Sequence, residues 1–251
     1  MESKMTGKVA IVTGGSSGIG RASAIAFGKA GANVVVAARR EAEGEETVKL
    51  IREAGGEGLF VKVDVTKAAD VEAMVNKTIE AYGRLDYAFN NAGSGNAGAI
   101  VDLTEADWDY EVNVNLKSIW LCMKYEIPAM KESGCGAIVN MSSQGALLGT
   151  ANYGAYGAAK AGVIALSRAA AAENSAAQIR INSVSPGAVK TDLWVDAPPE
   201  MLDQVAAGIP LKRIGKPEDI AEAVVWLCSD GAGFVTGHNL VIDGGFTAVQ
   251  K

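Results

Sequence analysis

Residues 13–20 read Thr13-Gly14-Gly15-Ser16-Ser17-Gly18-Ile19-Gly20 and decide the fold. Residues 8–12, just before them, are short, apolar and β-branched, as in a buried parallel strand. Residues 21–30, just after them, have apolar positions at helical spacing and end beside Gly31. The glycines therefore lie in a strand-to-helix turn, where free N–H groups and the helix dipole favour an anionic phosphate. An ordinary glycine-rich turn is the alternative, and the correct flanks argue against it.

The same stretch fits a second motif, the G-x-S-x-G nucleophile elbow of α/β-hydrolases. Ser16 would be the nucleophile and His238, the only histidine, would complete the order of a catalytic triad. A hydrolase is therefore an alternative from another class. It is disfavoured because such an elbow normally follows several strands, and this turn follows the first. The phosphate loop of nucleotide hydrolases is excluded, since the turn lacks its terminal Gly-Lys-Ser/Thr.

Composition narrows the class of protein. A chain of 251 residues with 49% hydrophobic residues is sufficient for one large α/β domain, residues 1–251. The net charge of −6 comes without any basic block, so nucleic acid is not an expected partner. No signal-peptide core and no apolar run of ~20 residues is present, which favours a cytoplasmic protein without a membrane contact. Three scattered cysteines and one histidine predict reduced thiols and no metal site.

The rest of the chain alternates strand and helix patterns. Strands are expected over 32–38, 59–63, 85–90, 135–141, 179–184 and 240–242, and helices over 41–54, 68–82, 104–131, 153–172 and 217–228. This order predicts a single-domain α/β fold, a Rossmann-type doubly wound parallel sheet of about seven strands with helices on both faces. Ligands of such sheets bind at the carboxyl ends of the strands. The least regular stretch, about 191–215, is expected to be a substrate lid.

The end of the second strand bears on the ligand. A dinucleotide fold that binds NAD places an acid about 20 residues after the glycines, but Ala38, Arg39 and Arg40 stand there. Two guanidiniums suit the 2′-phosphate of NADP(H), and a solvated pair balanced by nearby glutamates is the alternative. Asp64, at the end of the third strand, is a candidate partner for an adenine amino group or a helix N-cap, and the sequence does not separate the two.

Tyr156 and Lys160 are four residues apart in a predicted helix, so they share one face. A nearby ammonium favours the phenolate and is expected to lower the pKa of Tyr156, which would make it a usable general acid and base. Ser143 ends the preceding strand and can bind the same substrate oxygen. Alone the Tyr-x-x-x-Lys pattern is weak, and the glycine turn and the strand-end serine make it specific.

The chain resembles the short-chain dehydrogenase/reductase family over nearly its whole length, and in particular its 3-oxoacyl-[acyl-carrier-protein] reductase and glucose 1-dehydrogenase-like members. The matching pieces are Thr13-Gly14, Gly18, Gly20, Asp64, Asn90-Asn91-Ala92-Gly93, Asn115, Ser143, Tyr156, Lys160, Pro186-Gly187 and Thr191. The resemblance implies an NADP(H)-dependent oxidoreductase that transfers a hydride reversibly between the nicotinamide and a ketone or secondary alcohol. An NAD(H)-preferring alcohol dehydrogenase of the same family is the alternative.

The resemblance also implies roles for particular residues. Tyr156 would be the general acid and base, Ser143 would hold the substrate oxygen, Lys160 would bind the nicotinamide ribose, and Asn115 would hold a water that relays protons. The expected cofactor-binding residues are Gly14, Ser16, Ser17, Gly18, Ile19, Gly20, Arg39, Arg40, Asp64, Val65, Asn91, Ala92, Gly93, Tyr156, Lys160, Pro186, Gly187, Val189 and Thr191. Gln144, Leu193 and Trp194 are expected to line an apolar substrate pocket.

The family is typically a homotetramer, and the resemblance places the helices over 104–131 and 153–172 in one interface. Four apolar residues of the first helix are expected to supply more apolar surface than one sheet face needs: Leu116, Ile119, Trp120 and Met123.

Overall fold

The computed structural model describes residues 5–194 and 197–249. Within them seven strands form one sheet in the order β3-β2-β1-β4-β5-β6-β7, and all its pairings are parallel. The strands are β1 (Val9–Thr13), β2 (Asn33–Ala38), β3 (Glu57–Lys62), β4 (Tyr87–Asn90), β5 (Gly136–Met141), β6 (Ile179–Pro186) and β7 (Asn239–Ile242). The predicted single α/β domain with a doubly wound parallel sheet is confirmed.

The helices alternate with these strands. They are α1 (Gly18–Lys29), α2 (Glu41–Glu53), α3 (Ala68–Tyr82), α4 (Glu105–Val112), α5 (Ser118–Ser133), α6 (Gly154–Asn174), α7 (Pro199–Gly208) and α8 (Pro217–Cys228). Short turns complete the chain: the π-helical η1 (Asn113–Lys117) and the 3₁₀ turns η2 (Gln144–Ala146), η3 (Ser175–Ala177), η4 (Asp192–Trp194) and η5 (Asp230–Ala232).

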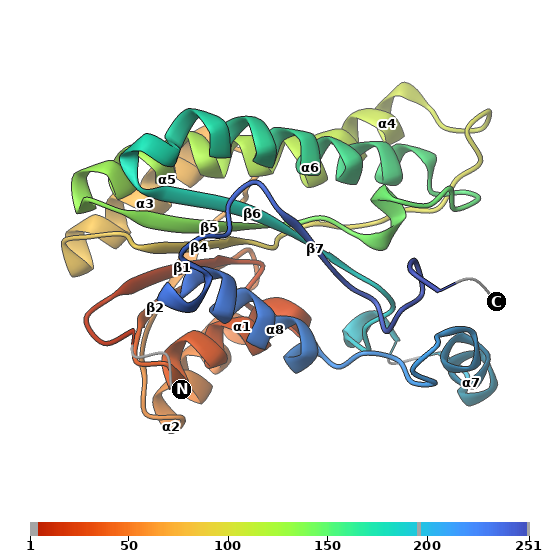
Figure 1. Ribbon diagram of the computed structural model, residues 1–251, viewed down its shortest axis with the longest axis horizontal. Helices are drawn as coiled ribbons and strands as arrows, with labels where there is room; N and C mark the ends of the chain where they lie inside the picture. Colours follow the sequence, from red (N-terminus) through yellow and green to blue (C-terminus); the bar gives the residue numbers. More distant parts are fainter. Residues whose placement is uncertain (1–4, 195–196, 250–251) are drawn as a thin grey trace.

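Helices cover both faces of the sheet, which explains why the strands are apolar throughout. Figure 1 shows α3, α4, α5 and α6 on one side and α1, α2 and α8 on the other. Along β1 the side chains alternate between two cores, with Ile11 in one and Ala10 and Val12 in the other. All five residues of β1 are buried. The side chains of β1 therefore belong to the core and not to a surface site.

The strand order reverses direction between β1 and β4. From β1 the chain first moves outward through β2 and β3, and it then returns to place β4 on the other side of β1. In a doubly wound sheet the crevice outside such a switch point binds the ligand. The glycine turn (residues 13–20) follows β1 and lies at this point.

The helix expected over 104–131 is interrupted. It divides into α4, the π turn η1 and α5, and the Ser118 N–H bonds back five residues to the Asn113 carbonyl. The π turn holds one residue more than a regular α-helical turn. No glycine or proline marks it, so the side-chain periodicity did not reveal it. Ile119 and Met123, expected to supply more apolar surface than one sheet face needs, are buried in the protein's own core, whereas Trp120 is 44% exposed.

The stretch over 191–215 is more regular than predicted, because α7 lies within it and begins with Pro199 at its first turn. Residues 195 and 196 of the expected lid lie outside the described residues. None of the helices in the described ranges combines the length and the apolar character needed to cross a membrane.

Candidate active site

The glycine turn brings backbone groups close together. Gly14 (φ +66°) and Gly18 (φ +52°) adopt left-handed conformations that favour glycine. A side chain at Gly20 would collide with the Gly14 carbonyl oxygen. The Ser17 side chain does not cap α1, so the N–H groups of the first helical turn remain available to an anion.

Thr13 and Asn91 fasten this turn to the end of β4. The Thr13 hydroxyl accepts hydrogen bonds from the N–H groups of Asn91 (3.0 Å) and Ala92 (3.1 Å). The Asn91 side-chain amide donates in return to the Thr13 carbonyl oxygen (3.0 Å). The two strand ends at the switch point are therefore held at a fixed separation.

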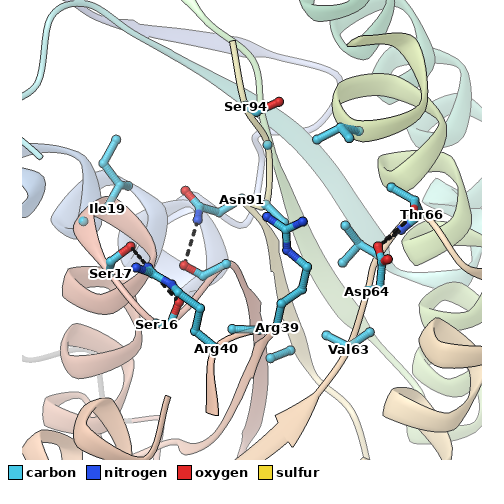
Figure 2. Close-up of a pocket in the computed structure, with 18 of the residues that line it drawn as sticks. Ser16, Ser17, Ile19, Arg39, Arg40, Val63, Asp64, Thr66, Asn91 and Ser94 are labelled. Atoms are coloured by element: carbon cyan, nitrogen blue, oxygen red, sulfur yellow. Dashed lines mark hydrogen bonds between the residues drawn. The ribbon is translucent and has the colours of Figure 1, made fainter. Parts of the chain in front are cut away.

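A cleft of about 470 Å³ opens beside the turn (Figure 2) and is called the first cleft below. It collects most of the expected cofactor-binding residues: Gly14, Ser16, Ser17, Gly18, Ile19, Arg39, Arg40, Asp64, Val65, Asn91, Ala92, Gly93 and Thr191. Sequence reasoning missed others that have no motif of their own: Val63, Thr66, Ser94, Tyr110, Val114 and Asp192. Tyr110 reaches the cleft from α4 and Val114 from the π turn. The sequence periodicity did not predict the π turn.

Two arginines stand at the β2 edge of the first cleft. Arg40 donates to the hydroxyl of Ser17 (2.6 Å) and to that of Ser16 (3.2 Å), and it lies 3.6 Å from Glu43. Figure 2 shows Arg39 extending into the cleft between Asn91 and Asp64. The side chain of Ala38, which ends β2, offers no acceptor. This edge therefore presents guanidinium and hydroxyl donors without a carboxylate at the β2 end, a set that suits a phosphate.

Asp64 is held by its neighbour Thr66. Its Oδ1 accepts from the Thr66 N–H (3.1 Å) and hydroxyl (2.7 Å), and these bonds lower the pKa of the carboxyl. The N-cap residue of α3 is Lys67, so the interpretation of Asp64 as that N-cap is wrong. Asp64 remains on the wall of the cleft, where its contact with an adenine stays a prediction.

Lys160 is buried and bonded to the end of β5. Its Nζ donates to the Met141 carbonyl oxygen (3.0 Å), and the Ser142 hydroxyl donates to the Lys160 carbonyl oxygen (2.9 Å). Burial lowers the pKa of Lys160 to about 8, and the negative charge of Glu111 opposes this shift. These bonds join α6 to the strand that carries Ser143.

Tyr156 differs from expectation. Burial raises its pKa, a hydrogen bond with the Ser143 side chain partly offsets the rise, and Glu111 and Tyr153 add to it. The expected lowering by Lys160 is wrong for this arrangement, because the ammonium points to the Met141 carbonyl and lies 5.7 Å from the centre of the Tyr156 ring. Tyr156 is therefore a protonated phenol at neutral pH, beside the hydroxyl of Ser143.

Asn115 lies in the π turn and is fully buried. Its amide donates to the Glu111 carboxylate (2.8 Å) and accepts from the Ser94 N–H (3.2 Å). A side chain at Gly93 would lie 2.7 Å from Asn115 Oδ1 and 3.3 Å from Lys160 Nζ. Asn115 and Lys160 therefore lie against Gly93, which lines the first cleft.

A second pocket of about 530 Å³ lies on the other side of Tyr156 and Ser143. Gln144 and Trp194 line it as expected, whereas the Leu193 side chain lies outside the described residues. Sequence reasoning missed further lining residues: Tyr153, Gln204, Val205, Ile209 and Phe246. Most come from α7 and the C-terminal loop, where no motif announces a site.

The remaining expected residues lie at the end of β6 and in the segment after it. Pro186 ends β6, Gly187 lines the second pocket, and Val189 is buried. The chain then returns to the glycine turn, where the Thr191 methyl would lie 3.1 Å from a side chain at Gly18.

The hydrolase alternative is wrong. Ser16 follows β1 and His238 precedes β7, four strand spacings or about 19 Å away across the sheet. The Ser16 hydroxyl accepts from Arg40, and the His238 backbone bonds to Asn182 and Ser183. These two residues cannot form a catalytic pair.

Comparison with known proteins agrees with this geometry. Residues 13–247 match a family model described as enoyl-(acyl carrier protein) reductase. The chain is 42% identical to a short-chain dehydrogenase/reductase of Aspergillus oryzae, covering 98% of this chain and 97% of the relative. It is 41% identical to the cis-4-hydroxycyclohexanecarboxylate dehydrogenase of Sinomonas cyclohexanicum, covering 96% and 97%.

A solved structure has the same fold. The crystal structure of a short-chain type dehydrogenase/reductase from Mycobacterium marinum superposes with a TM-score of 0.93 at 32% identity, covering 98% of each chain. The relatives are similar over nearly their full length and share the fold, and Ser143, Tyr156 and Lys160 are brought together. The chain belongs to the short-chain dehydrogenase/reductase family.

Proposed function

We propose that this protein is an NADP(H)-dependent oxidoreductase that interconverts a ketone and a secondary alcohol. One observation carries the proposal: the first cleft reaches a neighbour of Lys160, and the second pocket is lined by Ser143 and Tyr156. Gly93 lines the first cleft beside Lys160, and Tyr156, one helical turn earlier on α6, lines the second pocket with Ser143. A cofactor in the first cleft and a substrate in the second pocket would therefore meet beside one proton donor. The bound nicotinamide would supply the hydride chemistry.

The residues divide the remaining work. The Ser143 hydroxyl holds the substrate oxygen and orients it toward Tyr156. Tyr156 is protonated at neutral pH, so it gives a proton to that oxygen during reduction. Lys160 binds the ribose hydroxyls from the buried face of α6. Asn115, held in the π turn, positions a water beside Lys160 for proton exchange with solvent.

Two features support NADP(H) over NAD(H). Arg39 and Arg40 stand at the β2 edge, and Arg40 already bonds the Ser17 hydroxyl, so charge and hydroxyl donors converge there. Ala38 stands where an NAD-binding fold has an acid, so no carboxylate at that position repels a 2′-phosphate. The Ser17 position holds no basic residue, which makes the arginines the main source of the preference.

The second pocket suits a compact neutral substrate. Four aromatic side chains line it (Tyr153, Tyr156, Trp194 and Phe246), together with the amides of Gln144 and Gln204, and no charged side chain of the described residues does so. The Sinomonas relative is named for a ring alcohol that also carries a carboxylate. Its ring alcohol supports a cyclic secondary alcohol or ketone as the substrate class, and the uncharged pocket favours one without the carboxylate. The segment over about 191–215, which supplies Trp194 and α7, acts as the lid.

The protein is further proposed to be a homotetramer. Trp120 of α5 and Trp108 of α4 leave apolar surface exposed on these helices. Sedimentation should give a tetramer, and a stable monomer at micromolar concentration would contradict this part of the proposal.

The function is tested by screening ketones and alcohols with each nicotinamide cofactor. Carbonyl reduction with NADPH is expected, and Tyr156→Phe should abolish it while cofactor binding persists. Cofactor binding without turnover of any carbonyl would instead indicate a nicotinamide-sensing binding protein.

A further inference from the structure

Glu111 is the one residue of α4 that is buried within the described structure, and it is a carboxylate. Its side chain is 2% exposed. A buried carboxylate is costly unless hydrogen bonds and charges compensate it. The residues around Glu111 supply that compensation, and they are residues of the catalytic centre.

Both oxygens of Glu111 accept hydrogen bonds. Oε2 accepts from the Asn115 amide (2.8 Å), and Oε1 accepts from the Asn96 N–H (2.9 Å). The Asn115 amide also donates to the Glu111 carbonyl oxygen (3.2 Å). Because the Asn115 Nδ2 is bound here, its Oδ1 is turned toward Ser94, Gly93 and Lys160.

The second bond fixes a loop that packs on Tyr156. Asn96 belongs to the segment after β4, and a side chain at the neighbouring Gly95 would contact the Tyr156 ring at 3.4 Å. One carboxylate therefore connects α4, the π turn and the loop over the catalytic ring.

The charge of Glu111 also acts on both proton-handling groups. It favours the charged form of Lys160 and the protonated form of Tyr156, raising the pKa of each. The other polar or titratable groups acting on Tyr156 are Ser143 and Tyr153, and for Lys160 no further charge in the described residues adds to that of Glu111.

We infer that Glu111 is a positioning residue for the reaction: it orients Asn115 and holds the 94–96 loop against Tyr156. This inference rests on the proposed function. Geometry and charge are separable by substitution. Glu111→Gln removes the charge, and the new NH2 group then faces one of the two N–H donors that the carboxylate accepted from. Glu111→Asp keeps the charge but has a shorter side chain.

The first readout needs no substrate. The ultraviolet absorbance of phenolate is titrated in each protein, and subtraction of the matching Tyr156→Phe protein isolates this one of six tyrosines. In Glu111→Gln the Tyr156 titration should move to lower pH, and in Glu111→Asp it should stay near that of the wild type. Glu105→Gln, the same change at an exposed site on α4, is the matched control and should leave the titration unchanged.

The second readout is turnover. General acid–base catalysis contributes ~10²–10⁴-fold to the rate. Misorientation of the Asn115 amide, which supports it, should therefore lower kcat about tenfold in both variants, with little change in cofactor Kd. The pH profile should move to lower pH in Glu111→Gln alone. A wild-type titration in Glu111→Gln, or an equal shift in Glu111→Asp, would overturn the charge role.

A wild-type kcat in both Glu111 variants would overturn the positioning role. If Glu111→Gln does not fold, Glu111→Asp decides: a tenfold loss of kcat with an unshifted titration supports the inference, and any other pattern rejects it. A protein that turns over no carbonyl contradicts the proposed function instead, and the titration still decides the charge role.

Discussion

The first cleft and the catalytic half of the molecule are held together by different means. Around the first cleft, glycines bring backbone to backbone, and a side chain at Gly14 would press on Asn91 and Ala92. In the catalytic half, buried polar side chains join helices to strands. The Asn90 amide donates to Glu126 (2.9 Å) and Asn140 (3.0 Å), and the Asn140 amide donates to Ser167 (2.9 Å).

This difference teaches where chemistry can be changed independently. A backbone cradle carries no titratable group, so its specificity depends on a few side chains at its edge. A polar interior contains groups that ionise, so its integrity depends on pH. Substitutions in one half should therefore leave the other half's property intact.

The largest effect is expected from Tyr156→Phe. Losing the phenol removes the proton donor, and carbonyl reduction should fall by ~10²–10⁴-fold. The first cleft is untouched, so the cofactor Kd measured by nicotinamide fluorescence should stay within about twofold of the wild-type value. A tenfold change in Kd would correspond to a loss of about 1.4 kcal/mol of binding free energy. A parallel loss of cofactor affinity would show that the two halves are not separable.

The next effect is on stability and comes from Glu126→Gln. Burial raises the pKa of Glu126 to about 7, and its hydrogen bond from Asn90 only partly opposes this. Its folded pKa lies above its ordinary value of 4.5, so its contribution is complete below pH 4.5 and is lost as the pH rises through 7. At pH 8 the ionised carboxylate should cost about 3 kcal/mol of folding free energy.

Glutamine resembles the protonated acid, so Glu126→Gln should be more stable than the wild type at pH 8 and similar at pH 4. Denaturant unfolding at the two pH values measures this. Glu132→Gln, an exposed position on the same helix, is the control. Equal pH dependence in the Glu126→Gln protein and the wild type would contradict the role of buried ionisation in this half.

Cofactor choice should move third, through the edge of the first cleft. Charged hydrogen bonds contribute about 1.5–3 kcal/mol, so Ala38→Asp with Arg39→Leu should shift the NADPH/NADH ratio of kcat/KM by roughly 10- to 100-fold toward NADH. Substrate preference should not change. Equal use of both cofactors by the wild type would refute the NADP(H) assignment, as would a ratio that does not move in the variant.

The smallest effect is expected from Gln144→Leu in the second pocket. The Gln144 Oε1 is buried without a hydrogen-bond partner among the described residues. Losing the amide should alter KM up to about tenfold for substrates with a hydroxyl near the carbonyl, which can donate to Oε1, and little for plain ketones, since one neutral hydrogen bond contributes about 1 kcal/mol. Gln204→Leu, on α7, is the comparison. Identical KM changes for both substrate types would contradict a polar contact here.

The sequence predicted the two halves unequally. The glycine turn, the strand ends and the Tyr156–Lys160 pair lie in local patterns that fix their own geometry, and the topology follows from their alternation. The second pocket is assembled from α7 and Phe246, which are far apart in sequence and carry no spacing rule. Burial reversed the expected direction of the Tyr156 pKa, because desolvation depends on the whole surrounding and not on one neighbour.

Because of the π turn at Asn113–Lys117, the rotation of α5 relative to α4 about their shared axis depends on a single residue. Each residue turns an α-helix by about 100°, so deleting one residue there would restore regular winding and rotate α5 against α4 by that angle. Asn115 would turn away from Lys160, and Trp120 would rotate with it to a different azimuth. The number of residues in the π turn thus fixes both the position of Asn115 and the direction of Trp120. Insertions and deletions between 113 and 117 should be tolerated far less than substitutions.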